Sequence, residues 1–153
     1  MNILEITTKN FDSFKSDLIA LNDDFLKSIN VHKERSQDQK VTILKKMIDP
    51  STPTHLLIVL NEDKQAVGTA YFNTGTGYSC GGEYLWLNGI YIRTEERQKG
   101  YGAALIEYIE QWAKDRRYKL FMSSRDLDNE PSRKLFEQAG FKQSSNISIN
   151  KMY

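Results

Sequence analysis

Apolar residues recur with two different periods in the first third of the chain, and these periods predict the local structure. Branched and apolar residues close to the N-terminus are typical of a strand, whereas apolar residues three and four positions apart line one face of a helix. The predicted elements are a strand at 3–6, a helix over 11–26, a polar connection over 30–39 and a second helix over 41–48. Pro50 cannot continue a helix, so the second helix ends before it.

The middle of the chain predicts strands and a glycine-rich loop. Residues 55–61 and 66–72 have strand composition and flank turn-forming residues, so they are predicted to form a hairpin. Residues 73–82 contain four glycines and are predicted to be a loop. The almost wholly apolar and aromatic run 84–92 is typical of a strand that is buried on both faces.

The clearest helix of the chain is predicted over 100–116. Its apolar stripe consists of Leu105, Tyr108, Ile109 and Trp112. A short strand at 119–122 follows, and then a helix over 131–139, with Pro131 in its first turn and Gly140 after its end. Residues 141–153 are predicted to supply further strand material, with apolar residues at Ile147, Ile149 and Met152.

The order of these elements predicts a mixed α/β fold of the α+β type with a mixed sheet. The N-terminal half is mostly antiparallel, and residues 84–123 form a right-handed parallel β-α-β crossover. The length of 153 residues predicts a single domain over 1–153.

Composition excludes several classes of function. With 21 Lys and Arg against 20 Asp and Glu, the net charge of +1 predicts neither a nucleic-acid nor a membrane partner. Cys80 is the single cysteine and cannot form an internal disulfide, and residues 1–9 lack the features of a secretory signal, so we expect a cytoplasmic protein. His32 and His55 lie far apart without a neighbouring Cys or His, so no metal site is expected.

The candidate chemistry lies where the strand at 84–92 leads through a charged loop into the helix at 100–116. The first N–H groups of a helix have no partners within it, and the helix dipole adds partial positive charge there. Gly100 and Gly102 would let an anion approach these amides, and Arg97 and Lys99 would add cationic donors, an arrangement that suits a diphosphate. A tight strand-to-helix turn with two ordinary surface cations explains the same residues.

Two nucleotide-binding motifs fit this loop less well. A P-loop requires Gly-Lys-Ser/Thr, whereas this chain has Gly102-Ala103-Ala104. A dinucleotide fingerprint requires a third small residue where Leu105 stands. A protein that binds NAD is nevertheless kept as an alternative.

At this loop the chain resembles the GNAT superfamily of N-acetyltransferases. Residues 97–103, Arg-Gln-Lys-Gly-Tyr-Gly-Ala, match the family's Arg/Gln-x-x-Gly-x-Gly/Ala loop, and residues 129–141 resemble its second signature, an Asn, a helix and then Gly-Phe. The resemblance covers residues 56–141 and implies a single GNAT-like domain. It also implies direct transfer of acetyl from acetyl-CoA, without a metal, to a primary amine of a small molecule or peptide.

The resemblance further implies where the coenzyme binds. In the family, a bulged strand splays from the next parallel strand, and the pantetheine arm pairs with its backbone, which here belongs to Ile90, Tyr91 and Ile92. Asn129 would contact the pantetheine or the thiol, although an N-cap role for its helix explains this residue equally well. The residues implied to hold the diphosphate are Arg97, Gln98, Lys99, Gly100, Tyr101, Gly102 and Ala103.

The resemblance leaves the catalytic acid and base open. Some relatives have a Glu about where Asn88 stands, and an amide cannot act as a base. Glu83 is the best remaining carboxylate and could act through a water, although a solvated charge at a strand end explains it as well. Many relatives have a Tyr where Phe136 stands to protonate the leaving thiolate; Tyr101, Tyr118 or a water could replace it.

The sequence does not identify the acceptor. A set of aromatic residues near the loop either lines an acceptor pocket or packs the sheet: Tyr71, Tyr78, Tyr84, Trp86 and Tyr91. Because two usual catalytic residues are replaced, a non-catalytic acyl-CoA-binding regulatory module is the alternative function. The region after Phe141 is short for two strands, so a homodimer that shares a strand is a further hypothesis.

Overall fold

The computed structural model describes residues 1–145 and 151. Five strands form one sheet in the order β1-β2-β3-β4-β5, in which β4 and β5 are parallel and the other neighbours are antiparallel. The strands are β1 (Asn2–Ile6), β2 (Thr54–Leu60), β3 (Ala66–Gly77), β4 (Gly82–Ile92) and β5 (Leu120–Ser123). The predicted mixed sheet with a parallel β4–α3–β5 crossover is therefore confirmed.

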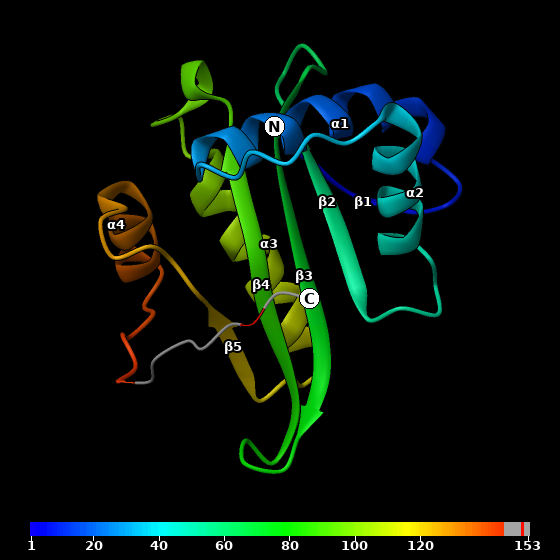
Figure 1. The fold of residues 1–153 in the computed structure, drawn as a ribbon. Coiled ribbons are helices and arrows are strands. Elements are labelled where there is room, and N and C mark those ends of the chain that lie inside the picture. Colours follow the sequence, from blue (N-terminus) through cyan, green and yellow to red (C-terminus); the bar gives the residue numbers. More distant parts are fainter. Residues whose placement is uncertain (146–150, 152–153) are drawn as a thin grey trace.

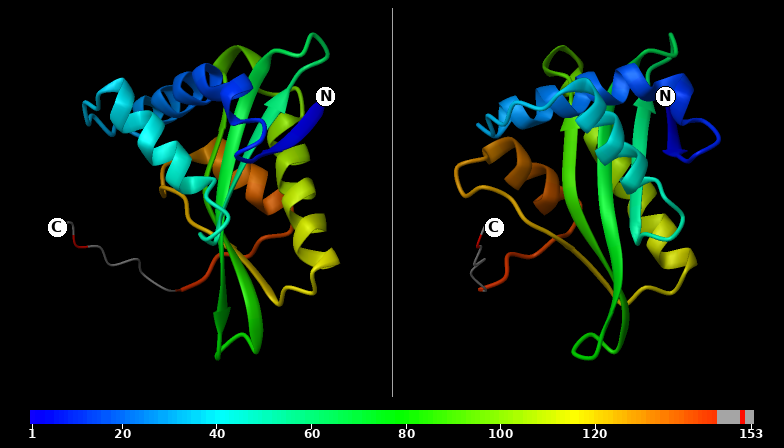
Figure 2. Two further views of the ribbon diagram at one scale, coloured as in Figure 1. Left: turned by 90° about the vertical axis from the view of Figure 1, so that its right-hand side faces the viewer. Right: turned by 45° about the vertical axis from the view of Figure 1, so that its right-hand side comes forward.

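Helices cover both faces of the sheet (Figures 1 and 2). The helices are α1 (Phe11–Ser28), α2 (Gln37–Met47), α3 (Tyr101–Asp115) and α4 (Glu130–Gln138). One core, the α1-side core, joins the sheet to α1 and α2 and includes Leu18, Leu21 and Ile58. The other, the α3-side core, joins it to α3 and α4 and includes Phe72, Leu105 and Ile109. None of the helices in the described part of the chain is long and apolar enough to cross a membrane.

Helix α2 begins earlier than its apolar spacing predicts. Ser36 and Gln39 form a capping box, in which the Gln39 N–H donates to Ser36 Oγ at 3.2 Å and the Ser36 N–H donates to Gln39 Oε1 at 2.9 Å. These two bonds satisfy amides that would otherwise lack partners at the helix start. The connection predicted over 30–39 is shorter for this reason.

The prediction of a glycine-rich loop over 73–82 is wrong for residues 73–77, which belong to a strand. Strand β3 continues to Gly77, and Thr74, Gly75 and Thr76 pair with the first residues of β4. The ring of Tyr84 lies across Gly75, its partner in the register, and covers the bare backbone there. A cross-strand aromatic ring thus compensates for the missing side chain.

Strand β4 is not buried on both faces, contrary to its prediction. Leu85 and Leu87 are buried in the α3-side core, whereas Trp86 and Asn88 between and after them are exposed. Helix α1 crosses the sheet at the end where β4 terminates and α2 stands beside β2, so no described helix lies over the first part of β4 on this face (Figure 1). Buried and exposed side chains therefore alternate along the first part of β4.

The predicted C-terminal strand material lies largely outside the described residues. Residues 141–145 belong to no strand. Ile147, Ile149 and Met152 are not among the described residues, so this prediction stays a prediction.

A stack of three rings lies in the α3-side layer. The His55 ring is stacked on Phe72 with centroids 4.8 Å apart, and Trp112 meets both rings edge-on at 4.7 and 5.1 Å. His55 Nδ1 lies 2.7 Å from Glu5 Oε1 and donates to it. The hydrogen bond from His55, helped by the charges of His55 and Arg116, lowers the pKa of the Glu5 carboxyl against the opposing effect of burial.

We expect this contact to make stability depend on pH at the acid end. Because the pKa of Glu5 is lower in the folded protein, its contribution is complete above the ordinary glutamate pKa and is lost as the pH falls through the folded value. Glu5→Gln should lower the free energy of unfolding at pH 7 by at most about 1 kcal/mol, because the side chain is partly exposed to solvent. Urea unfolding at pH 7 and at pH 3 checks this, and a difference that persists at pH 3 would contradict it.

Candidate active site

Strand β4 carries a β-bulge at Asn88. The register with β3 pairs Tyr71 with Gly89 but Phe72 with Leu87, so Asn88 has no partner across the ladder. A bulge locally disrupts the ladder and increases the twist of the strand. The bulge therefore divides β4 into two parts. The first part pairs with both β3 and β5, and the second part pairs with β3.

The second part of β4 has a free edge, that is, an edge that no strand of the described residues pairs with. Strand β5 pairs with Tyr84–Leu87 of β4 and ends there, and the Ser123 hydroxyl donates to the Leu87 carbonyl at 3.0 Å. The Arg93 N–H donates to Val67 on β3 at 2.9 Å. Because neighbouring residues of an antiparallel strand direct their backbone groups to opposite edges, those of Ile90 and Ile92 face the free edge and those of Tyr91 face β3.

The loop after β4 delivers unpaired amides to one place. Gln98 has φ 62° and Gly100 has φ 86°, a left-handed conformation that favours glycine at the N-cap of α3. The bond from Ala104 N–H to Gly100 O, 3.0 Å, begins the helix, so the amides of the three preceding residues have no carbonyl partner within it. Among the described residues no side chain caps this end, and the first turn of α3 contains no acid.

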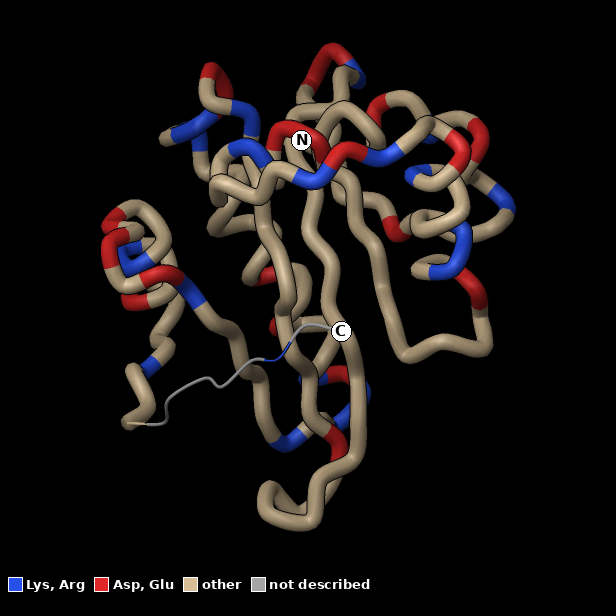
Figure 3. The backbone as a smooth tube through the Cα atoms, in the orientation of Figure 1, with Lys and Arg blue, Asp and Glu red and all other residues tan. Residues whose placement is uncertain are grey.

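Arg97 and Lys99 lie beside these amides, but each already has a protein partner. Arg97 Nε donates to the Ile92 carbonyl at 3.1 Å, and its guanidinium lies 5.8 Å from the centre of the Tyr91 ring. Lys99 Nζ lies 3.0 Å from Glu96 Oε2, and the lysine side chain is exposed. The loop thus carries two cations, and two carboxylates, Glu95 and Glu96, directly precede it (Figure 3).

The two glycines of the loop have different surroundings. A Cβ at Gly100 would have no atom within 4 Å, so the approach to the amides is open there. A Cβ at Gly102 would lie 3.3 Å from Leu135 Cδ2. Gly102 therefore lets α3 pack closely against α4, and its role toward a ligand stays a prediction.

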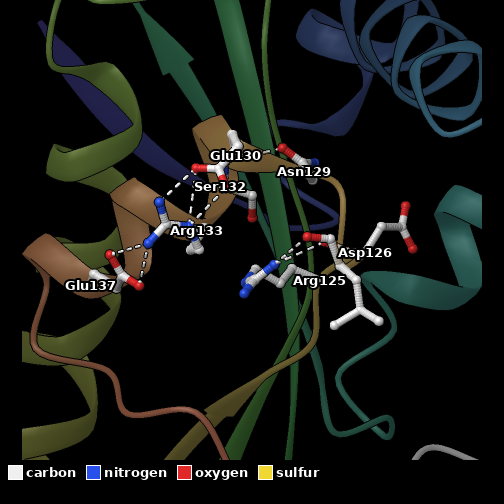
Figure 4. A network of polar contacts seen from close by, with 8 residues as sticks. Arg125, Asp126, Asn129, Glu130, Ser132, Arg133 and Glu137 are labelled. Carbon is white, nitrogen blue, oxygen red and sulfur yellow. Dashed lines mark hydrogen bonds and ion pairs between the residues drawn. The ribbon is translucent and has the colours of Figure 1, made fainter.

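Asn129 begins helix α4 as its N-cap. Its Oδ1 accepts the Ser132 N–H at 3.0 Å, so this oxygen is engaged by the helix (Figure 4). Arg133 holds the next turns together through Glu130 at 2.7 Å and Glu137 at 2.9 Å. Arg125 donates to the carbonyls of Asp126 and Leu127 and so orders the loop before α4.

The candidate acids and bases lie in different parts of the fold. Glu83 is exposed near the start of β4, five residues before the bulge, which is about 16 Å along a strand. Phe136 is buried, with its ring 5.1 Å from Phe141. The Tyr118 ring meets Trp112 edge-on near the far end of α3, whereas Tyr101 is the first residue of that helix.

Four of the five aromatic residues proposed for an acceptor pocket lie on the α1 side of the sheet, and one of these, Tyr91, is buried there. Tyr71, Tyr84 and Trp86 lie on the α1 side of the sheet, and burial raises the pKa of the Tyr71 hydroxyl. Tyr78 stands at the tip of the β3–β4 hairpin, 106% exposed, and Tyr91 is buried beneath α1. Within residues 1–145 and 151, no group of His, Cys, Asp and Glu could hold a metal ion.

The sequence matches the acetyltransferase (GNAT) family over residues 18–141. The chain belongs to this family. The match includes the bulged strand, the loop at 97–103 and the start of α4, and it extends beyond the resemblance that the motifs alone carried.

Known GNAT relatives agree with this fold. An aminoglycoside N(6')-acetyltransferase type 1 from Klebsiella aerogenes is 32% identical over 91 residues, which cover 58% of this chain and only 60% of that protein. A solved probable acetyltransferase has a TM-score of 0.83 at 18% identity, covering 100% of this chain and 97% of its own. An aminoglycoside N-acetyltransferase solved in complex with CoA has a TM-score of 0.78 at 15% identity, covering 99% and 93%.

Proposed function

We propose that this GNAT protein is an acetyl-CoA-dependent N-acetyltransferase. The acceptor is a primary amine of a small molecule or peptide, and transfer is direct within a ternary complex. The observation that carries the proposal is the free edge of β4 beside the uncapped start of α3. An extended amide-containing arm fits the first feature and a diphosphate fits the second.

The residues present suit coenzyme A. The backbone groups of Ile90 and Ile92 would pair with the pantetheine arm, with Tyr91 between them packing into the α1-side core. The loop residues 97–103 would hold the diphosphate, and Arg97 would exchange its bond to Ile92 for one to the coenzyme. The amide nitrogen of Asn129 would reach the pantetheine, because the oxygen serves the helix.

The chemistry needs an activated amine more than a strong acid. Bound acetyl-CoA supplies a thioester, whose carbonyl carbon forms a bond to the amine nitrogen as the bond to sulfur breaks. A β4 backbone N–H at the free edge would polarise the carbonyl oxygen. The amine must first lose a proton to a base or to water, and the departing thiolate, with a thiol-like pKa of about 8.5, can take its proton from water.

Glu83 as the base stays a prediction, and it would need a chain of waters to span about 16 Å along the strand. A base at this position predicts that Glu83→Gln lowers kcat at least tenfold and removes the acidic limb of the pH profile. A profile that matches the unchanged protein would assign the proton to water alone. Glu62→Gln, in the exposed turn between β2 and β3, is a matched control for the loss of one carboxylate.

A thiol-release assay tests the proposed function. The amine panel should include an aminoglycoside, because one aminoglycoside N-acetyltransferase is similar in sequence and another in fold. A polyamine and peptide N-termini complete the panel. We expect turnover with at least one of these small amines. Coenzyme A binding by calorimetry without turnover for any amine would favour a regulatory module instead, and binding of NAD in place of coenzyme A would overturn the proposal.

We also propose that residues 1–153 form a single domain that acts in the cytoplasm. We further propose that two copies of the chain form a homodimer that shares a strand. Gel filtration at two protein concentrations tests the assembly. A monomer at both would rule out a strand shared between subunits.

A further inference from the structure

Among the described residues, no helix covers the first part of β4 on the α1 side of the sheet, and this part of the face bears polar side chains. Asn73 on β3 lies opposite Trp86 on β4, and the two therefore share a face. Trp86 and Asn88 are exposed there. Within β3 and β4, Glu83 near the hairpin end is the one charged residue, so the face near the bulge offers uncharged groups (Figure 3).

A chain of hydrogen bonds crosses three strands on this face. Asn73 Nδ2 donates to Thr54 Oγ1 on β2 at 2.9 Å. Asn88 Nδ2 donates to Asn73 Oδ1 and also to the backbone carbonyl of Trp86, at 3.2 Å. The chain thus ends at the bulge residue itself.

These bonds fix which way the Asn88 amide points. A backbone carbonyl only accepts hydrogen bonds, so the Asn88 atom that faces Trp86 O must be the NH₂ group. The NH₂ group then serves both Trp86 and Asn73, and Oδ1 of this exposed residue has no hydrogen-bond partner among the described residues. Asn73 is held in the matching orientation by Thr54.

The bulge also places Asn88 where the two substrates of the proposed reaction would meet. Leu87 is the last residue of β4 that pairs with β5, and the free edge begins beyond the bulge with Ile90. Asn88 therefore lies at the point where the two strands part. A group bound to its Oδ1 on the α1 side of the sheet lies beside the start of the free edge.

We propose that Asn88 Oδ1 accepts a hydrogen bond from the acceptor amine and positions it for transfer, with Asn73 and Thr54 holding the amide in register. This inference rests on the proposed function and deepens it at the same site. A neutral amide accepts the bond without taking the proton, so Asn88 is a positioning residue and the proton leaves through water. The adjacent exposed Trp86 ring would contact the body of the amine.

Steady-state kinetics with varied amine and saturating acetyl-CoA test this assignment. Asn88→Ala should raise the KM of the amine about tenfold, the size expected for one lost hydrogen bond to a charged partner. We expect kcat to change by less than about threefold and the Kd of coenzyme A to be unchanged, because the amine then binds more weakly without a loss of chemistry. Asn88→Leu, of similar size without an acceptor, should behave in the same way.

Asn73 provides the coupling test. Asn73→Ala releases the Asn88 amide and should raise the KM of the amine about threefold, but it should have no further effect in a protein that already carries Asn88→Ala. Thr76→Ala is the matched control, because Thr76 is an exposed residue of β3, the strand that also carries Asn73. It should leave every constant unchanged.

The outcomes separate this inference from the proposed function. No turnover of any amine by the unchanged protein would count against the function itself. Turnover by the unchanged protein with an unaltered amine KM in Asn88→Ala would overturn the inference alone. A loss confined to kcat, or an effect of Asn73→Ala that persists in the double variant, would also overturn it.

Discussion

Ala103→Glu is expected to weaken the binding of coenzyme A about 100-fold while leaving the fold as stable as before. The residue is exposed in the first turn of α3, beside the unpaired amides at Tyr101 and Gly102. A carboxylate there would face the proposed diphosphate. Two unit charges about 6 Å apart at an effective dielectric constant of about 20 repel by about 3 kcal/mol, which corresponds to a factor of about 100 in affinity.

The same substitution should not harm the helix. Glutamate is nearly as good a helix former as alanine, and an acid in the first turn interacts favourably with the helix dipole by about 0.3–1 kcal/mol. Helix α3 lacks such an acid, whereas α1, α2 and α4 each have one. The melting temperature should therefore stay constant or rise slightly. Gly102→Glu would be a poorer test, because its side chain would push against Leu135.

Calorimetric titration with coenzyme A, paired with thermal unfolding, measures both effects. Ala103→Gln adds the same volume without the charge and should change the Kd less than about threefold. The difference between the two variants should shrink at high salt, since exposed charges are screened over about 10 Å at 0.1 M. Equal affinities for the Glu and Gln variants would show that no anion binds at the start of α3.

The loop and its helix could be predicted because their determinants are local. Gly100 adopts the left-handed conformation that its position requires, Pro131 lies in the first turn of α4, and Gly140 follows that helix with φ 84°. The capping box of Ser36 and Gln39 is equally local and was readable from its spacing, although apolar periodicity alone placed the helix start too late.

The hydrogen-bonded residues of the proposed acceptor site could not be predicted, because they meet only through strand register. Thr54, Asn73 and Asn88 come from three strands, and a one-residue slip would direct any of them to the other side of the sheet. The apolar composition of β4 predicted burial on both faces, but Trp86 and Asn88 are exposed. Their burial depends on how far α1 and α2 extend over the sheet, which the sequence of β4 does not specify. The packing role of Gly102 could not be predicted for a related reason, because its neighbour Leu135 belongs to another helix.

Phe72→Ala is expected to cost about 3–5 kcal/mol of unfolding free energy, a large share of the roughly 5–15 kcal/mol of a typical domain. Phe72 is fully buried and has the largest side chain of the fully buried residues. The cavity cannot easily collapse. Glu5 holds His55 on one side of the ring, and Arg116 lies 4.0 Å above the ring centre of Trp112 on the other. Urea denaturation monitored by tryptophan fluorescence and circular dichroism measures the loss.

Two further variants serve as controls for the expected loss of unfolding free energy. Phe72→Leu keeps much of the volume and should cost about 1.5 kcal/mol or less, whereas Tyr78→Ala at the exposed hairpin tip should stay within about 0.5 kcal/mol of the unchanged protein. A loss below about 1 kcal/mol for Phe72→Ala would mean that the ring stack does not pack as described. Because Phe72 faces α3 and the Asn73–Asn88 pair faces the other side of the sheet, the amine KM of Phe72→Leu should match that of the unchanged protein well below its melting temperature. Stability and acceptor binding would then be properties of opposite faces of the same two strands.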